Sequence, residues 1–227
     1  MFEEYLEESY ILDFKSETIK ALIKERKWRM MEAYDCISSI YCYVRDEILY
    51  QKVLKPNLRS SEVLARGKGG AYTKAILLMS LLRGAGIPTR LHVYRVYKHL
   101  MFGILDKKHL KKLPDELPHY ACEVYYDSKW ISLEGVILDG EYIKGLSRRL
   151  EGRTGAYIGY GIGVSDIKHI DIDFHGSDVL MQAKAMSSEG GIYSTPDEIV
   201  GRGITELSFL DTYFINKNIE KIRKNRA

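Results

Sequence analysis

Apolar residues at the N-terminal end recur with the period of amphipathic helices. Ser16 is suited to cap a first helix, whose apolar face carries Ile19, Leu22 and Ile23. A second helix is predicted from about Trp28 to Tyr50, because its apolar residues share one face; they are Ile37, Ile40, Tyr41, Val44 and Ile48. The N-terminal region is therefore expected to be helical, and Pro56 marks a loop after it.

The next segment contains an apolar run without a polar face. A short helical turn that begins at Ser60 or Ser61 ends in glycine. Residues 75–82 are apolar with almost no interruption, which predicts a fully buried helix. Gly84 and Gly86 are expected to end that helix, since Pro88 follows directly.

Alternation with period two then predicts a sheet. Residues 89–97 alternate and are rich in β-branched and aromatic side chains, as expected of a strand. Residues 119–126 and 129–133 are predicted to form a hairpin that turns at 127–128. The buried helix is therefore followed by at least three strands.

The remaining segments are less regular. Residues 98–118 form a long connection that carries Lys98, Lys107, Lys108, Lys111 and Lys112. A connection of this length is expected either to act as a lid or to form a helix that completes the core. Residues 150–166 are rich in glycine, residues 170–181 are expected to hold a short strand, and residues 205–224 a helix. No repeat or change of composition marks a second domain, so one domain over 1–227 is predicted.

Composition narrows the class of protein. The 227 residues are 45% hydrophobic and 29% charged, a balance typical of globular proteins. A net charge of +3 is too small to predict nucleic-acid binding, and no apolar run has the ~20 residues of a membrane span. The cysteines Cys36, Cys42 and Cys122 cannot all pair, and none is in a CxxC spacing. We therefore expect a reduced, cytoplasmic protein.

Several kinds of site are excluded by spacing. The histidines include no HExxH pair for a catalytic zinc, and GKGG lacks the length of a phosphate-binding P-loop. Asp173, His175 and Asp178 are too isolated to predict a metal site, and no cofactor is expected. What remains is a Gly-rich turn leading into a buried helix. A cysteine at such a helix start would have a low pKa, and His119 on a nearby strand could pair with it.

Four blocks carry a resemblance to a known family. They are VRDEILY (44–50), SSEVLARGKGG (60–70), KAILLMSLLRGAGIPTRLH (74–92) and HYACEVYYDSKWISLE (119–134). In order and spacing they resemble the transglutaminase-like, papain-related superfamily. The resemblance implies a single α+β domain with a papain-like fold, in which a catalytic helix packs on an antiparallel sheet. Its parts would be N-terminal helices over 1–55, the catalytic helix and sheet over 60–140, and a C-terminal extension over 141–227.

The resemblance also implies a catalytic triad. Carried over residue by residue, the nucleophilic cysteine of the family falls on Ala71, its histidine on His119 and its acid on Glu134. Glutamate replaces the aspartate of the family pattern, and Asp139 is an alternative acid. In such a triad the histidine moves the proton while the carboxylate orients the imidazole.

Ala71 departs from the family pattern, because alanine cannot form a thioester. Cys36 and Cys42 lie in the N-terminal helices, and Cys122 has the opposite strand parity to His119, so none of them replaces the nucleophile. We interpret Ala71 as an engineered replacement of cysteine, which leaves the chain inactive as written. A natural pseudoenzyme and a nucleophile at another position are the alternatives.

The family implies an acyltransferase that forms an amide. The acyl donor would be a small molecule, a peptide or an acidic carrier protein docked on the basic 98–112 segment, and the acceptor an amine. Water as acceptor would make the protein a cysteine peptidase or amidase, and a binding module is the third hypothesis. Gly70 and Tyr72 are expected at the oxyanion site, and Tyr157, Tyr160 and Phe102 in the cleft or its lid. No nucleic-acid or membrane partner is expected, and a homodimer is considered.

Overall fold

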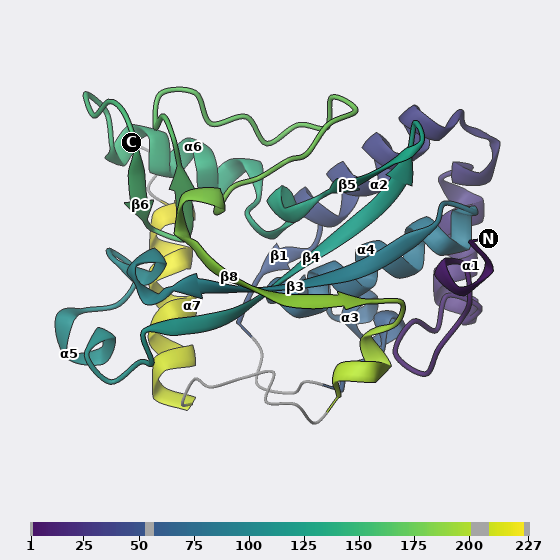
Figure 1. Ribbon diagram of the computed structural model, residues 1–227, viewed down its shortest axis with the longest axis horizontal. Helices are drawn as coiled ribbons and strands as arrows, with labels where there is room; N and C mark the ends of the chain where they lie inside the picture. Colours follow the sequence, from purple (N-terminus) through teal and green to yellow (C-terminus); the bar gives the residue numbers. More distant parts are fainter. Residues whose placement is uncertain (1, 53–56, 201–208, 225–227) are drawn as a thin grey trace.

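A curled antiparallel sheet forms the centre of the molecule. The structure is a computed structural model that describes residues 2–52, 57–200 and 209–224. Its main sheet has four strands in the order β5-β4-β3-β8 (Figure 1). They are β3 (Thr89–Tyr97), β4 (Glu116–Tyr126), β5 (Lys129–Ser132) and β8 (Met186–Tyr193). The predicted strand 89–97 and the predicted hairpin are confirmed, and Asp127 and Ser128 both take positive φ angles at the turn.

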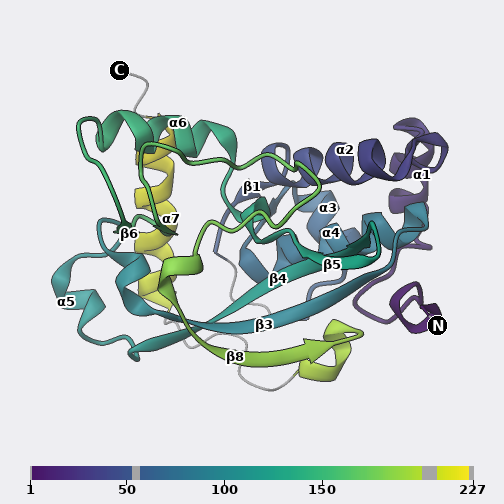
Figure 2. The ribbon, with the colours of Figure 1, turned by 45° about the horizontal axis from the view of Figure 1, so that its top comes forward.

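The N-terminal helices lie on one side of this sheet (Figure 2). They are α1 (Glu17–Glu25), α2 (Ala33–Asp46), α3 (Ser60–Arg66) and α4 (Ala71–Ala85). Helix α4 is the innermost, because it contacts α1, α2 and α3 as well as β3 and β4, and its residues 72–84 are all buried. This position explains why the helix has no polar face. The arrangement confirms an α+β class with a helix packed on an antiparallel sheet.

Three predicted helix boundaries are wrong. The second helix, predicted to reach Tyr50, ends at Asp46, because a short strand, β1 (Leu49–Tyr50), follows it. Helix α2 begins at Ala33 rather than Trp28, because Lys27 takes a φ of 56° and residues 28–30 form a separate 3-10 turn. Gly84 does not end α4; it lies inside the helix, where a Cβ would come within 2.4 Å of Ile23. Gly86 alone ends the helix, with a φ of 97° that favours glycine. Pro56, the predicted loop marker, lies outside the described residues.

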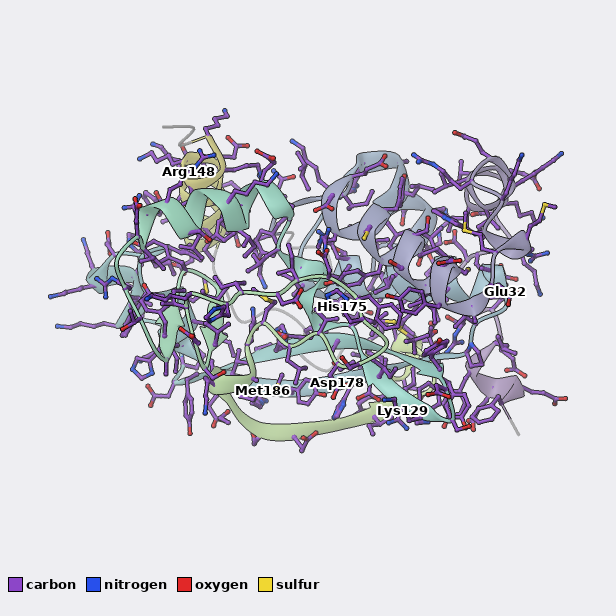
Figure 3. The ribbon with its side chains drawn as sticks, turned by 90° about the horizontal axis from the view of Figure 1, so that it is seen from above. Glu32, Lys129, Arg148, His175, Asp178 and Met186 are labelled. Atoms are coloured by element: carbon purple, nitrogen blue, oxygen red, sulfur yellow. The ribbon has the colours of Figure 1, made fainter. Side chains whose placement is uncertain are left out.

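The C-terminal part differs more from the prediction. Residues 170–181 contain no strand; they cross above the sheet as an irregular segment, on which His175 and Asp178 are seen in Figure 3. Single hydrogen bonds fasten this segment, for example from Ser132 N–H to Asp178 Oδ1 at 2.8 Å. Strand β8 was not predicted, because MSSEGGIY contains two glycines and lacks apolar alternation at an exposed sheet edge.

Further helices and a hairpin complete one end of the molecule. They are α5 (Lys107–Leu110), α6 (Gly140–Arg149), the hairpin of β6 (Tyr157–Gly159) and β7 (Ile162–Val164), and helix α7 (Phe209–Lys224). Helix α7 crosses behind one end of the sheet (Figure 1). The predicted helix over 205–224 is thus confirmed from 209, whereas residues 205–208 lie outside the described residues. None of the described helices is both long and apolar enough to cross a membrane.

Candidate active site

Two short parallel strands fix the start of helix α4. Strand β1 (Leu49–Tyr50) pairs with β2 (Lys68–Gly69), and the Gln51 N–H donates to the Gly69 carbonyl at 2.9 Å. Gly70 is the N-cap of α4, and its N–H donates to the Thr73 hydroxyl at 2.7 Å. Ala71 is therefore the first residue of a long buried helix. There, peptide N–H groups without an intrahelical partner favour negative charge.

A buried histidine and glutamate face each other near this helix start. His119 lies in β4, and Glu134 begins the 3-10 helix η4 (Glu134–Ile137) after β5. Their side chains approach to 2.9 Å between Nε2 and Oε1, and the two residues are 3% and 0% exposed. The other oxygen of Glu134 accepts hydrogen bonds from the backbone N–H groups of Met181 and Gln182, at 2.5 and 3.0 Å. These charge-assisted bonds hold the carboxylate in place.

The two nitrogens of His119 have different surroundings. Nε2 faces Glu134 at ion-pair distance, but the two atoms are not aligned for a hydrogen bond. Within the described part of the chain, Nδ1 has no hydrogen-bond partner. His119 and Ala71 both line one small cavity of about 80 Å³. The imidazole thus has a carboxylate beside one nitrogen, and its other nitrogen is available for proton transfer.

The walls of this cavity are mostly apolar. They come from β3, β4, η4, helix α7 and the 3-10 helix η3 (Lys98–Met101). Ile215 and Ile219 are the contribution of α7. The polar side chains in the lining are those of Tyr50, Lys52, His119 and Gln182. An apolar cavity with a few polar groups is typical of a small-molecule site.

A family model matches the part of the chain that contains these residues. The model described as transglutaminase-like superfamily matches residues 22–135, half of the chain. The chain belongs to the transglutaminase-like superfamily. The match contains α4, His119 and Glu134, and this is a superfamily of cysteine-dependent enzymes.

Other comparisons add little to the family assignment. No curated protein matches the chain. Among solved structures, it is similar to a candidate cysteine protease from Cytophaga hutchinsonii, at 17% sequence identity and a TM-score of 0.45. That alignment covers 58% of this chain and 40% of the other. The chain therefore spans less than half the length of this structural relative.

The residues expected at the oxyanion site of this transglutaminase-like protein have other contacts. The Gly70 N–H is occupied by Thr73. The Tyr72 ring packs edge-on against Tyr120, with centroids 5.1 Å apart, and its buried hydroxyl has no partner in the described structure. Neither residue lines the cavity, whereas Ala71 does. The oxyanion role of Gly70 and Tyr72 stays a prediction.

Asp139, the alternative acid, is engaged elsewhere. It caps helix α6 by accepting a hydrogen bond from Tyr142 N–H at 2.9 Å. Its carboxylate also pairs with Arg223 of α7, at 2.5 Å. The structure thus brings Glu134, and not Asp139, next to His119.

The three aromatic residues expected in the cleft or its lid make other contacts. Tyr160 accepts a hydrogen bond from Arg149 Nε at 3.0 Å, and its backbone N–H donates to the Phe102 carbonyl at 2.6 Å. Phe102 is 45% exposed, and Tyr157 lies in the β6–β7 hairpin. None of the three lines the cavity, although Gly161 next to Tyr160 does. Their role as a lid stays a prediction.

Three polar residues near the cavity were not predicted. Lys52 and Gln182 line it, and Lys74 lies one turn after Ala71, fully buried. Lys74 donates to the carbonyls of Arg45 at 2.9 Å and Ile137 at 3.3 Å, and burial lowers its pKa to about 7. A lysine within the apolar α4 run was the one available signal for a special role. Lys52 and Gln182 lie in irregular segments where no periodicity marks them.

Proposed function

We propose that this site is that of a transglutaminase-like acyltransferase, in which alanine stands at the position of the nucleophile. The observation that carries the proposal is the buried His119–Glu134 pair, whose histidine opens onto the same cavity as Ala71. With Ala71 the chain would bind an acyl donor without reacting. With cysteine at position 71 it would form a thioester and pass the acyl group to an amine.

The chemistry follows from the position of each group. A thiol at residue 71 would give its proton to Nδ1 of His119, and the start of helix α4 would favour the resulting thiolate. Attack on a carbonyl forms the C–S bond, and the imidazolium protonates the leaving group. An amine then attacks the thioester; the C–N bond forms, the C–S bond breaks, and the amine proton returns through His119. Free N–H groups of the first turn would stabilise the oxyanion.

The choice between an amine and water depends on access to the site. The mostly apolar cavity, closed on one side by Ile215 and Ile219, favours an organic acceptor over bulk water. The acyl donor is proposed to be a small molecule, a peptide or an acidic carrier protein. Lys98 in the basic segment already pairs with Asp115 at 2.8 Å, which leaves the lysines from 107 to 112 as the candidate docking cations.

Mass spectrometry of an installed cysteine tests this function. The Ala71→Cys variant is incubated with a short-chain acyl thioester of N-acetylcysteamine, and an acyl adduct at residue 71 is sought by intact-mass analysis and peptide mapping. Addition of a diamine should release the adduct as an amide. The Ala71→Cys/His119→Ala variant serves as the control and should acylate at least 100-fold more slowly. Release only by water would identify a hydrolase, and no adduct would favour a binding module.

A further inference from the structure

Lys52 is fixed at the side of the cavity through its backbone. Its N–H donates to Asn216 Oδ1 at 2.7 Å, and its carbonyl accepts from Asn216 Nδ2 at 3.0 Å. The preceding residue, Gln51, is bonded to Gly69 just before the start of helix α4. These bonds tie Lys52 both to the helix that carries Ala71 and to α7, and Lys52 is one of the residues that line the cavity.

Among the described residues, the ammonium group of Lys52 has no counterion. No carboxylate in the described part of the chain forms an ion pair with it, and burial lowers its pKa to about 8. Most molecules at neutral pH therefore carry a half-buried positive charge at this position. The other buried lysine, Lys74, differs because two carbonyl groups bind its Nζ. An anionic group of a ligand would offset the cost of burying the Lys52 charge.

Gln182 also lines this cavity, and its amide oxygen has no hydrogen-bond partner in the described structure. The residue is 7% exposed, and its Nε2 donates to the Gly161 carbonyl at 2.8 Å. Because a carbonyl only accepts, the amide nitrogen must face Gly161 and the oxygen is left over. Oε1 has no partner in the described structure. The backbone of Gln182 is bonded to Glu134, so this acceptor is held in register with the His119–Glu134 pair.

The size of the cavity limits the apolar part of a ligand. Its volume of about 80 Å³ is smaller than the ~150 Å³ of a protein cavity that binds benzene. The surrounding side chains, which include Val96, Leu117 and Ile215, are aliphatic. A short aliphatic group is the occupant that such a space favours.

We propose that this cavity binds a small compound that joins three features: a short aliphatic side chain, an N–H donor for Gln182 Oε1 and a carboxylate for Lys52. This is the chemistry of an aliphatic α-amino acid or its N-acyl derivative. The inference rests on the proposed function, since it takes the cavity beside Ala71 as the substrate cleft. A free amino acid would be the amine acceptor, and an N-acyl amino acid the amide product.

Binding of four related compounds to the unaltered protein tests the proposal. Binding of L-valine and N-acetyl-L-valine is measured by NMR titration of the protein with Ala71 in place. N-acetyl-L-valinamide removes the carboxylate, and 3-methylbutanoate removes the N–H donor. We expect saturable binding of at least one of the first two, and a loss of about tenfold for each removed group. Absence of saturable binding by both, or equal binding by all four compounds, would overturn the proposal.

Protein variants assign each contact. Lys52→Met should weaken N-acetyl-L-valine about tenfold and leave N-acetyl-L-valinamide unchanged. Gln182→Met should weaken the amino acid but not 3-methylbutanoate. Lys144→Met, in a side chain that is 68% exposed on α6, is the matched surface control and should change nothing. A result in which Lys144→Met acts like Lys52→Met would show general electrostatics instead of a site.

The outcome is separable from that of the acyl-transfer test. Binding is measured without a nucleophile, so it can be present even where Ala71→Cys fails to acylate. Conversely, acylation of the Ala71→Cys thiol without any binding of these compounds would leave the acyltransferase in place and remove the assignment of its acceptor.

Discussion

Two histidines on the same face of the sheet contact glutamates, and they differ in whether a ring nitrogen is left free. His92 pairs with Ala121 across the strands and His119 with Tyr94, so both side chains point to one face. Nδ1 of His92 is 2.6 Å from Glu123, and Nε2 is 2.5 Å from Glu189. His119 has a carboxylate on one nitrogen alone. A histidine held on both nitrogens cannot take a proton from a substrate, whereas one held on a single nitrogen can.

The two histidines also differ in their surroundings. Burial disfavours the charged form of His92, but its hydrogen bonds to Glu123 and Glu189 outweigh that effect and raise its pKa above 6.5. These contacts favour the cationic form of His92, which bridges Glu123 of β4 and Glu189 of the edge strand β8. His119 is more deeply buried and opens onto the cavity with Ala71. Proximity of a histidine and a glutamate therefore does not by itself indicate a catalytic pair. A catalytic histidine also needs a ring nitrogen that is free to transfer a proton.

Removal of Glu134 and removal of Glu189 should have very different effects on stability. Glu134→Leu leaves the N–H groups of Met181 and Gln182 without an acceptor, and we expect a loss of about 3–5 kcal/mol in the free energy of unfolding. Glu189→Leu, at a side chain that is 73% exposed, should cost less than about 1 kcal/mol. Urea unfolding followed by circular dichroism measures both. Similar losses for the two variants would contradict the distinction.

A second comparison separates the two candidate acids. In the Ala71→Cys background, Glu134→Gln should raise the pKa of the new thiol by about 1 unit, or about 1.4 kcal/mol, because the imidazolium loses its carboxylate. Asp139→Asn, whose carboxylate is bound to Arg223, should leave the thiol pKa unchanged. The pH dependence of alkylation gives both values. A larger shift in Asp139→Asn would restore that residue as the orienting acid.

The His92 link predicts a pH dependence of smaller size. Because the pKa of His92 is raised in the folded state, its contribution to stability is complete below pH 6.5 and is lost as the pH rises through the folded pKa. We expect the difference in unfolding free energy between the parent chain and His92→Gln to be about 1 kcal/mol at pH 5.5 and to shrink towards pH 9. A difference that is constant over this range would show that His92 is uncharged in its site.

Local patterns explain which parts of the fold could be predicted. Helix α4 gives a strong sequence signal because burial on all sides requires a continuous apolar run. Strand β3 gives one because burial alternates along a strand. The turn at Asp127 and Ser128 is likewise local. Strand β8 depends on pairing with β3 across about a hundred residues, and its glycines give no apolar signal.

The residues of the candidate site likewise fall into those that could be predicted and those that could not. Ala71, His119 and Glu134 were located by resemblance to a family, through blocks close to one another in the sequence. Lys52 and Gln182 lie in segments without regular structure, and their backbones are held by hydrogen bonds to the side chains of Asn216 and Glu134. No local pattern encodes such contacts, since each depends on the folded positions of distant residues.

The most direct test of the central claim is the reactivity of a thiol at position 71. Ala71→Cys is alkylated with iodoacetamide from pH 4 to 9, and peptide mapping separates residue 71 from the native cysteines. Those are distinct, because burial raises the pKa of Cys36 to about 11 and also raises the pKa values of Cys42 and Cys122. His119→Ala and the matched His92→Ala are added to this background.

We predict that the pKa of the thiol at residue 71 lies well below the ~8.5 of a free cysteine. His119→Ala should remove this lowering of the pKa, and His92→Ala should leave it unchanged. A thiol that titrates like free cysteine, or that responds equally to both histidine variants, would contradict the account.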